Sequence, residues 1–469
     1  MPASCARRKV PDMKAIVVIL DSLRRDHVGC YGADAIHTPA LDQLSREAVR
    51  FTNPKPEALA TIQTRRAIHT GNRVFPFGGH QTPKGDAVPW AGWEAHPESA
   101  VTLSEIARNS GFHTGLVTDV YHQFKPAMNF HRGFNQFIWV RGQESDRWQS
   151  RHLIDEATAT AHSYPVQHTD AGRERIQRYL ANVAWRRYEE DYFAPRVFSE
   201  AMRFIEDNRE QDFLLFVDCF DPHEPWDPPR WYLDRYAPGY RGTDLIWPNY
   251  GPCDGLGPEE LRLIRALYAG EVTMTDRWLG IFLEHCHDLG IMDDTLLIVL
   301  SDHGHSLGEH GVMGKLPRSL YPELVDIFLM VRRPGGEGGG ASCDSFVYTH
   351  DLMPTVLNQL GLEAPLPVEG QDLLAIADGS APGRDHAVTG FHNYVAYADS
   401  EYWYFSDHGR SDQHLYDLRS DPDCRNNLAS GNADRCDRFF EICLRQAGGE
   451  FPDITPEQLR RASPWYEML

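Results

Sequence analysis

The sequence predicts an α/β fold: a large, doubly wound, mostly parallel sheet flanked by helices. Three observations support this prediction. The first is a set of short apolar runs, which are typical of parallel strands buried on both faces. Segments with helical patterns lie between these runs. An acidic residue lies at or just after the end of four of them, at Asp21, Asp119, Asp218 and Asp302. The runs occupy 15–20, 114–118, 213–218, 295–300 and 326–331.

Helix signals stand between the runs in chain order. Thr38 and Pro39 predict a helix start before 40–49, with the threonine as cap and the proline in the first turn. The segment 102–111 ends in Gly111, a favourable helix stop. A long helical pattern over 258–290 ends in Gly290, just before the run at 295–300. Because the carboxyl ends of parallel strands form the ligand-binding edge of such sheets, the four acidic residues predict a site there.

The domain prediction is a catalytic α/β domain over 1–375 and a smaller C-terminal α+β subdomain over 376–469. Polar and aromatic residues fill 140–200, which predicts a helical insertion that covers the site, including a helix over 173–193. The stretch 394–407 alternates and then turns, as an antiparallel hairpin does.

Composition limits the possible partners. The chain has 469 residues and a formal net charge of −21, which disfavours nucleic acid and anionic membranes. No apolar run approaches the about 18 residues of a membrane helix. The run at 15–20 is short and ends in Asp21, so we expect a strand rather than a signal peptide. The nine cysteines are scattered and show no CxxC spacing, which favours a reduced, cytoplasmic protein. The composition is also compatible with a homo-oligomer.

Three segments carry a family resemblance: "DSLRRDHVGCYG" after the first run, "TIQTRRAIHTG" at 61–71, and "SDHGHSLGEHGVMGK" at 301–315. Together they resemble the sulfatase family of the alkaline-phosphatase-like superfamily. In that family a modified cysteine or serine lies in a Cys/Ser-x-Pro-x-Arg motif. Here Thr61 and Arg65 occupy the two ends of the motif, and Gln63 replaces the proline. A threonine cannot become the formylglycine aldehyde of sulfate-ester cleavage, so the resemblance favours phosphorus chemistry.

The resemblance implies one divalent metal ion, held by Asp21, Thr61, Asp302 and His303. Ser22 stands where a second aspartate is often found in the family. The loss of one carboxylate favours Mn or Zn, and Ca stays possible. A cation lowers the pKa of an oxygen that it binds, so the Thr61 hydroxyl is the expected nucleophile.

Four further residues complete the predicted catalytic set. Arg65 follows Thr61 by one helical turn, in a helix that Gly71 ends, and is expected to stabilise the anion. The resemblance assigns His223 as general acid or leaving-group clamp, and Lys315 as phosphate or sulfate contact. His122 is the fourth.

Several neighbouring residues are weaker candidates. Thr118 and Asp119 look like the phosphonate monoester hydrolase branch of the family, and Tyr121 lies in the same segment. Arg66 is expected in a peripheral ion pair. The others are possible stand-ins, supporting residues or loop residues: Tyr321, Glu323, His305, His310, His80 and Gln81.

The sequence therefore predicts a metal-dependent hydrolase that cleaves phosphate mono- or diesters, or phosphonate monoesters, through a covalent intermediate on Thr61. The expected partner is a small anionic ester. Three alternatives remain: a sulfatase that uses an unmodified threonine, a phosphotransferase, and a non-catalytic binding protein. The last is disfavoured by the retention of Asp21, Arg65, Asp302, His303 and Lys315.

Overall fold

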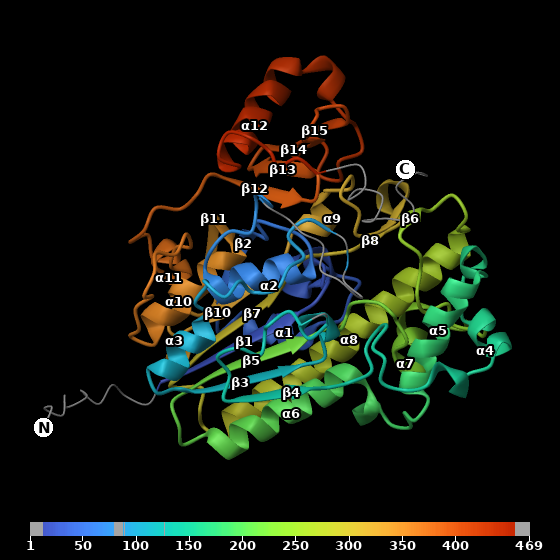
Figure 1. Ribbon diagram of the computed structural model, residues 1–469, viewed down its shortest axis with the longest axis horizontal. Coiled ribbons are helices and arrows are strands. Elements are labelled where there is room, and N and C mark those ends of the chain that lie inside the picture. Colours follow the sequence, from blue (N-terminus) through green and yellow to red (C-terminus); the bar gives the residue numbers. More distant parts are fainter. Residues whose placement is uncertain (1–12, 79–87, 89, 126, 455–469) are drawn as a thin grey trace, which may run out of the picture.

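The central sheet of the computed structural model contains eight strands within the described residues, 13–78, 88, 90–125 and 127–454 (Figure 1). Its strand order is β11-β2-β10-β7-β1-β5-β3-β4. The strands span β1 (Lys14–Leu20), β2 (Val49–Lys55), β3 (His113–Thr118), β4 (Gln136–Trp139), β5 (Phe213–Cys219), β7 (Thr295–Ser301), β10 (Leu329–Arg332) and β11 (Ser342–Tyr348). All five predicted runs are strands of this sheet, so the fold class is confirmed.

Strand β10 runs against its neighbours, which corrects the expectation that all five runs are parallel. It pairs antiparallel with both β7 and β2, whereas the other pairings in this sheet are parallel. Parallel strands need a crossover that returns the chain to the opposite edge. Between β7 and β10 the chain forms a small hairpin of β8 (Ser306–Leu307) and β9 (Val312–Gly314), then α9 (Pro322–Val325). None of these is a crossover helix, so β10 starts at the edge where β7 ended.

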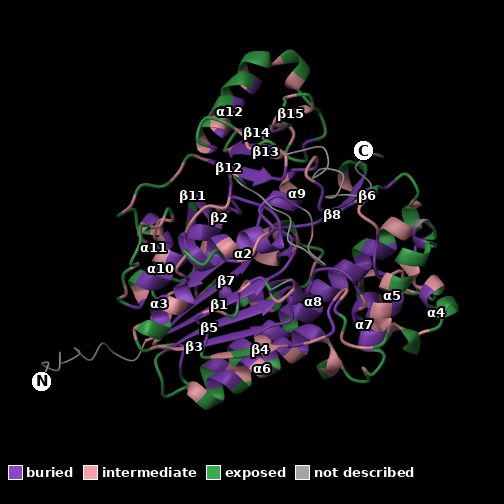
Figure 2. Cartoon of the chain, viewed as in Figure 1, coloured by how far each residue is buried: buried purple, intermediate pink, exposed green. Residues whose placement is uncertain are grey.

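Helices cover both faces of the sheet (Figure 2). The hydrophobic core therefore consists of two clusters, one on each face. Side chains Ile16, Val18 and Leu20 of β1 join one buried cluster, and Ala15, Val17 and Ile19 join the other. This explains the unbroken apolar run, since every side chain of β1 is buried. The first cluster includes α1 (Pro39–Leu44), α6 (Phe193–Asn208) and α8 (Pro258–Asp288). The second includes α2 (Thr61–Thr70), α3 (Leu103–Asn109), α10 (Leu352–Gln359) and α11 (Leu373–Ala377).

The start of α1 differs from its predicted cap. Thr38 Oγ1 accepts from the Gly29 N–H at 2.8 Å and makes no cap hydrogen bond. The buried carboxylate of Asp276 on α8 accepts from Ala40 and Leu41 instead, both at 2.9 Å. A residue distant in sequence thus satisfies the helix N-terminus, which the local pattern could not reveal.

The predicted insertion contains α4 (Glu156–Ala161) and α5 (Asp170–Val183). The helix expected over 173–193 ends at Val183, and α6 begins separately at Phe193. Helix α6 packs against β3 and β5, so it belongs to the central layers. Helix α7 (Arg230–Tyr236) packs beside α8.

The C-terminal part forms a four-stranded antiparallel sheet with α12 (Ala433–Gln446) against it (Figure 1). Its strands are β12 (His386–Phe391), β13 (Tyr394–Asp399), β14 (Tyr402–Asp407) and β15 (Gln413–Asp417). The hairpin predicted over 394–407 is β13 and β14. The predicted division at residue 375 lies within α11.

Two general properties concern the described part of the chain. None of its helices combines the length and the apolar composition that a membrane span requires. Its eight cysteines are free thiols, as the composition predicted.

Candidate active site

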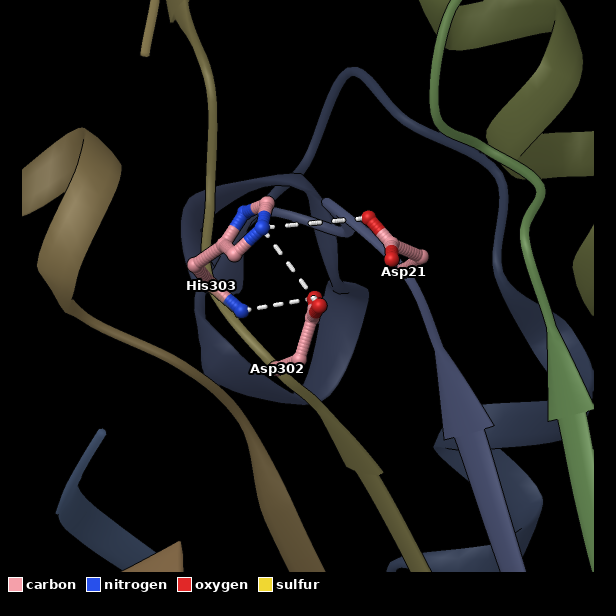
Figure 3. Close-up of side chains that lie close together, drawn as sticks. All are labelled: Asp21, Asp302 and His303. Atoms are coloured by element: carbon pink, nitrogen blue, oxygen red, sulfur yellow. Dashed lines mark hydrogen bonds and ion pairs between the residues drawn. The ribbon is translucent and has the colours of Figure 1, made fainter. Parts of the chain in front are cut away.

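The register of the sheet places two acidic residues side by side. Leu20 pairs with Ser301 across β1 and β7, so the next residues, Asp21 and Asp302, leave the same edge together. His303 follows, and ligand atoms of the three residues lie within 4.8 Å of one another (Figure 3). All three side chains are fully buried. The sequence-predicted metal residues therefore form one group.

Hydrogen bonds hold the members of this group in fixed orientations. Asp302 Oδ1 accepts from the Ser22 and His303 N–H groups, at 3.0 and 2.8 Å. His303 Nδ1 lies 2.9 Å from the Gly304 carbonyl, to which it donates, so Nε2 carries the lone pair. That Nε2 faces Asp302 Oδ2 at 3.4 Å and Asp21 Oδ1 at 3.9 Å.

The donor set fits a divalent cation. Two carboxylates and one imidazole nitrogen are suitable ligands for Mn or Zn. Asp21 Oδ2 accepts no hydrogen bond within the described residues, although Arg65 Nη1 lies 3.0 Å away. Burial and the neighbouring Asp302 charge raise the pKa of Asp21 well above its usual value. Burial opposes ionisation of Asp302 too, but the charges of His303 and Arg65 hold its pKa below the usual range. A cation between the carboxylates would offset their repulsion.

Thr61 is the first residue of α2 and is buried at this group. Its Oγ1 lies 3.3 Å from His303 Nε2. Gln63, which replaces the family's proline, accepts the Ala60 N–H at 3.0 Å and donates to the Ala91 carbonyl at 2.8 Å. The helix ends at Gly71, whose φ of 67° suits glycine. Thr61 thus opens a helix, as the sequence predicted, with its hydroxyl facing the metal residues.

Arg65 lies beneath the group and has no exposed surface. Its Nε and Nη2 donate to Asp218 at 2.8 and 2.6 Å, and Nη1 donates to Asp302 at 2.6 Å and to the Thr61 carbonyl at 3.1 Å. The sequence predicted that Arg65 stabilises the substrate anion. The structure instead engages Arg65 with protein carboxylates, because Asp218 on β5 and Asp302 after β7 flank the carboxyl end of β1. Arg65 is therefore a positioning residue.

Lys315 and His223 form a second group beside the first. Lys315 Nζ lies 2.9 Å from His223 Nε2 and 3.4 Å from Ser22 Oγ, which in turn donates to Asp21 at 2.8 Å. His223 Nδ1 lies 2.7 Å from the Glu224 carbonyl. Burial, and then the Lys315 charge, lower the pKa of His223 well below its usual value. These contacts describe a neutral His223 that accepts from Lys315.

Sequence reasoning missed Glu224, which organises this second group. Its Oε2 lies 3.3 Å from Lys315 Nζ and 3.4 Å from His305 Nδ1, and it accepts from the Tyr250 hydroxyl. Burial opposes ionisation, yet Lys315 and His305 keep the pKa of Glu224 below its usual value. An acidic residue directly after His223, in a buried segment, was the available signal.

His122 lies apart from the metal group. Its Nε2 is 2.9 Å from Glu144 Oε2, and its ring meets the edge of Trp93. Its ring centre is 6.0 Å from that of Phe220, which stacks on His223 at 3.9 Å. His122 therefore approaches the second group across one aromatic ring.

Most of the weaker candidates make hydrogen bonds or ion pairs within the protein. Thr118 accepts from the Val120 N–H, and Asp119 accepts from the Phe220 N–H. Arg66 donates to the Gly92 carbonyl and lies 3.6 Å from Glu94, as expected for a peripheral pair.

Other weaker candidates complete the set. Tyr121 is buried, and burial raises its pKa well above the usual value. His310 stacks on Tyr321 at 3.7 Å, with Nε2 3.6 Å from Glu323, and His305 supports Lys315. His80 and Gln81 lie outside the described residues.

The comparison with known proteins decides the family. The family model described as Sulfatase matches residues 14–362. The chain belongs to the sulfatase family. It is 37% identical over 400 residues to the multifunctional alkaline phosphatase superfamily protein PehA of Trinickia caryophylli, covering 78% of this chain and 77% of that protein. It is 25% identical over 487 residues to an arylsulfatase of Clostridium perfringens, covering 94% and 95%.

Solved structures of this family share the fold. The phosphonate monoester hydrolase of Agrobacterium radiobacter is similar with a TM-score of 0.71 and 18% identity, covering 93% of this chain and 95% of that one. The corresponding enzyme of Silicibacter pomeroyi gives 0.68 and 20%, covering 95% and 98%. A sulfatase-family hydrolase of α/β fold is thus established, and members of the family typically use a divalent metal.

Proposed function

We propose that this protein is a metal-dependent phosphoester hydrolase that acts on mono- or diesters, or on phosphonate monoesters, with Thr61 as its nucleophile. One observation carries the proposal: an unmodified threonine hydroxyl opens α2 and lies 3.3 Å from His303 Nε2. The PehA relative, a multifunctional member of the alkaline phosphatase superfamily, supports the choice of phosphorus.

Asp21, Asp302, His303 and Thr61 would hold the cation, with Mn or Zn favoured by the donor set. When bound, a divalent cation lowers the pKa of a coordinated hydroxyl and offsets charge on the phosphoryl group. Arg65 keeps Asp21 and Asp302 in position through the contacts described above. The N-terminus of α2 adds a positive dipole end near Thr61.

The residues of this chain then divide the reaction between them. The Thr61 hydroxyl releases its proton to solvent as Oγ forms a bond to phosphorus. The ester P–O bond breaks, and the alcohol leaves with a proton. Lys315 carries protons next to His223 Nε2, 2.9 Å away, so the pair supplies that proton from the ammonium group. Water then attacks phosphorus and gives a proton to the neutral Lys315 amine, while Thr61 Oγ leaves and takes up a proton from solvent. The product is phosphate from a monoester, a phosphate monoester from a diester, and a phosphonate from a phosphonate monoester.

The sulfatase alternative is favoured by a different observation, the name of the arylsulfatase relative. It would share the metal group and Lys315, but an unmodified threonine offers no aldehyde hydrate for releasing the sulfate.

One parallel assay separates these functions. Purified protein of known metal content is tested on aryl phosphate, aryl phosphodiester, aryl phosphonate monoester and aryl sulfate with the same phenol. We expect turnover of at least one phosphorus ester to exceed that of the sulfate. Preferred turnover of the sulfate would contradict the proposal.

A further inference from the structure

The insertion brings an arginine to the neighbourhood of Lys315. Arg175 lies in the first half of α5 and is half-buried. Its Nη2 donates to Asn249 Oδ1 at 2.8 Å, and its guanidinium carbon lies 4.4 Å from the centre of the Trp247 ring. Tyr250 follows Asn249 in the chain, and Lys315 Nζ lies over the Tyr250 ring, 5.2 Å from its centre. Arg175 is thus about one side-chain layer from the second group of the active site.

The cation of Arg175 lacks a full set of partners. Its Nε is buried and makes no hydrogen bond within the described residues. Within the described residues, no carboxylate oxygen lies within 4.0 Å of a guanidinium nitrogen of Arg175, the distance that defines an ion pair. Arg173, two residues earlier on α5, does pair with Asp170, at 2.5 Å. Burial lowers the pKa of Arg175, as expected for a guanidinium without a close counter-charge.

Two acidic residues, Glu144 and Glu224, interact electrostatically with Arg175, but both make their close contacts with other residues. Glu224 contacts Lys315 and Tyr250, and Glu144 lies 2.9 Å from His122. A planar guanidinium fork binds oxyanions with directed, charge-assisted hydrogen bonds. Because Glu144 and Glu224 lie near, a singly charged carboxylate is repelled less than a doubly charged phosphate.

We propose that Arg175 binds a carboxylate on the organic part of the substrate, so that the enzyme selects phosphoesters whose alcohol is itself anionic. The inference rests on the proposed function for the reacting group at Thr61. It assigns the insertion a role in selecting the substrate. Asn249 and Trp247 orient the guanidinium through the contacts described above.

Binding of a matched pair of non-hydrolysable probes tests the proposal. The probes are 4-carboxyphenylphosphonate and its uncharged counterpart, 4-carbamoylphenylphosphonate, titrated into the metal-loaded protein by calorimetry. We expect the carboxylate to bind about tenfold or more tightly. Arg175→Gln should abolish the difference, and Arg175→Lys should retain part of it. Arg173→Gln changes the net charge equally on the same helix and should keep the full preference.

Equal or undetectable binding of the two probes by the wild-type protein would overturn the proposal, as would a preference that survives Arg175→Gln. Turnover of 4-carboxyphenyl phosphate is measured in parallel. Probe discrimination without any turnover would leave the carboxylate site standing and refute the proposed hydrolase. Turnover without discrimination would do the reverse.

Discussion

Thr61 is the residue on which the chemistry depends, and its hydroxyl is not a helix cap. Ala60 is the N-cap of α2, and Thr61 Oγ1 contacts His303 instead. Thr61→Ala should therefore abolish turnover with little loss of stability. Thr61→Ser should stay active, because the oxygen is kept and only the restriction of the β-branch is lost. Acid-quenched mass spectrometry should find a phosphoryl adduct on the Thr61 peptide, and near-normal turnover by Thr61→Ala would refute the mechanism.

Asp302 tests the metal group at the same scale. Asp302→Ala removes a carboxylate that faces both Asp21 and His303, so we expect it to lose most of the bound Mn, Zn or Ca. Elemental analysis of the purified variant gives the measurement. Asp119→Asn is the matched control, since Asp119 is a buried acid at the same sheet edge but bonds to the Phe220 N–H. Full metal occupancy in Asp302→Ala would show that the ligands were assigned wrongly.

The pair of Lys315 and His223 predicts a dependence on the leaving group. Lys315→Met removes the proton source, so esters of weakly acidic alcohols should slow by about 10²–10⁴-fold. Esters of acidic phenols need little protonation and should slow less. His223→Ala should show the same pattern more weakly, because the contact with Lys315 positions the ammonium. Equal losses on both kinds of ester would assign the pair to binding alone.

At the scale of elements, strand β12 supports the segment that precedes Thr61. The Gly390 N–H donates to the Glu57 carbonyl, and the Leu59 N–H donates to the Gly390 carbonyl, both at 2.9 Å. A side chain at Gly390 would place its Cβ 2.1 Å from Phe75 Cδ2. Gly390→Ala should therefore cost about 1–3 kcal/mol of stability and lower kcat by displacing the start of α2.

Gly431 provides the control for this steric argument, because an added Cβ there meets no atom within 4 Å. Gly431→Ala should leave both the denaturation midpoint and kcat near the wild-type values. If Gly390→Ala were equally silent, the C-terminal subdomain would not be a support for the active site.

At the scale of the whole molecule, Glu57 links stability to pH. Its carboxylate accepts from the Val74 and Phe75 N–H groups, but burial dominates and raises its pKa to about 7 from the usual 4.5. The folded state therefore binds this proton more tightly than the unfolded state. The resulting stability is complete below pH 4.5 and is lost as pH rises through about 7.

Urea unfolding at pH 5 and pH 8 measures this contribution. The wild-type protein should lose up to about 3 kcal/mol more than Glu57→Gln between the two values, since the amide does not titrate. Equal losses in the two proteins would show that Glu57 titrates alike in the folded and unfolded states.

The sequence by itself predicted the layers of the fold and, with the family resemblance, the candidate metal ligands. Buried parallel strands must be apolar on both faces, so the runs were visible, and strand ends place Asp21 and Asp302 at one edge. The opening of α2 at Thr61 was also visible, because Gly71 marks the other end of the helix. Strand β2 was missed because Arg50, Asn53 and Pro54 interrupt its apolar pattern.

Only the tertiary structure decided which groups face one another. The direction of β10 follows from the absence of a crossover, and the cap of α1 comes from Asp276, more than two hundred residues later. Arg65 binds Asp218 and Asp302 because three separate segments meet at one sheet edge. Likewise, Glu224 and Arg175 acquired their positions from contacts across the chain. Local patterns report the burial and periodicity of a segment, whereas the partner of a buried charge depends on long-range packing.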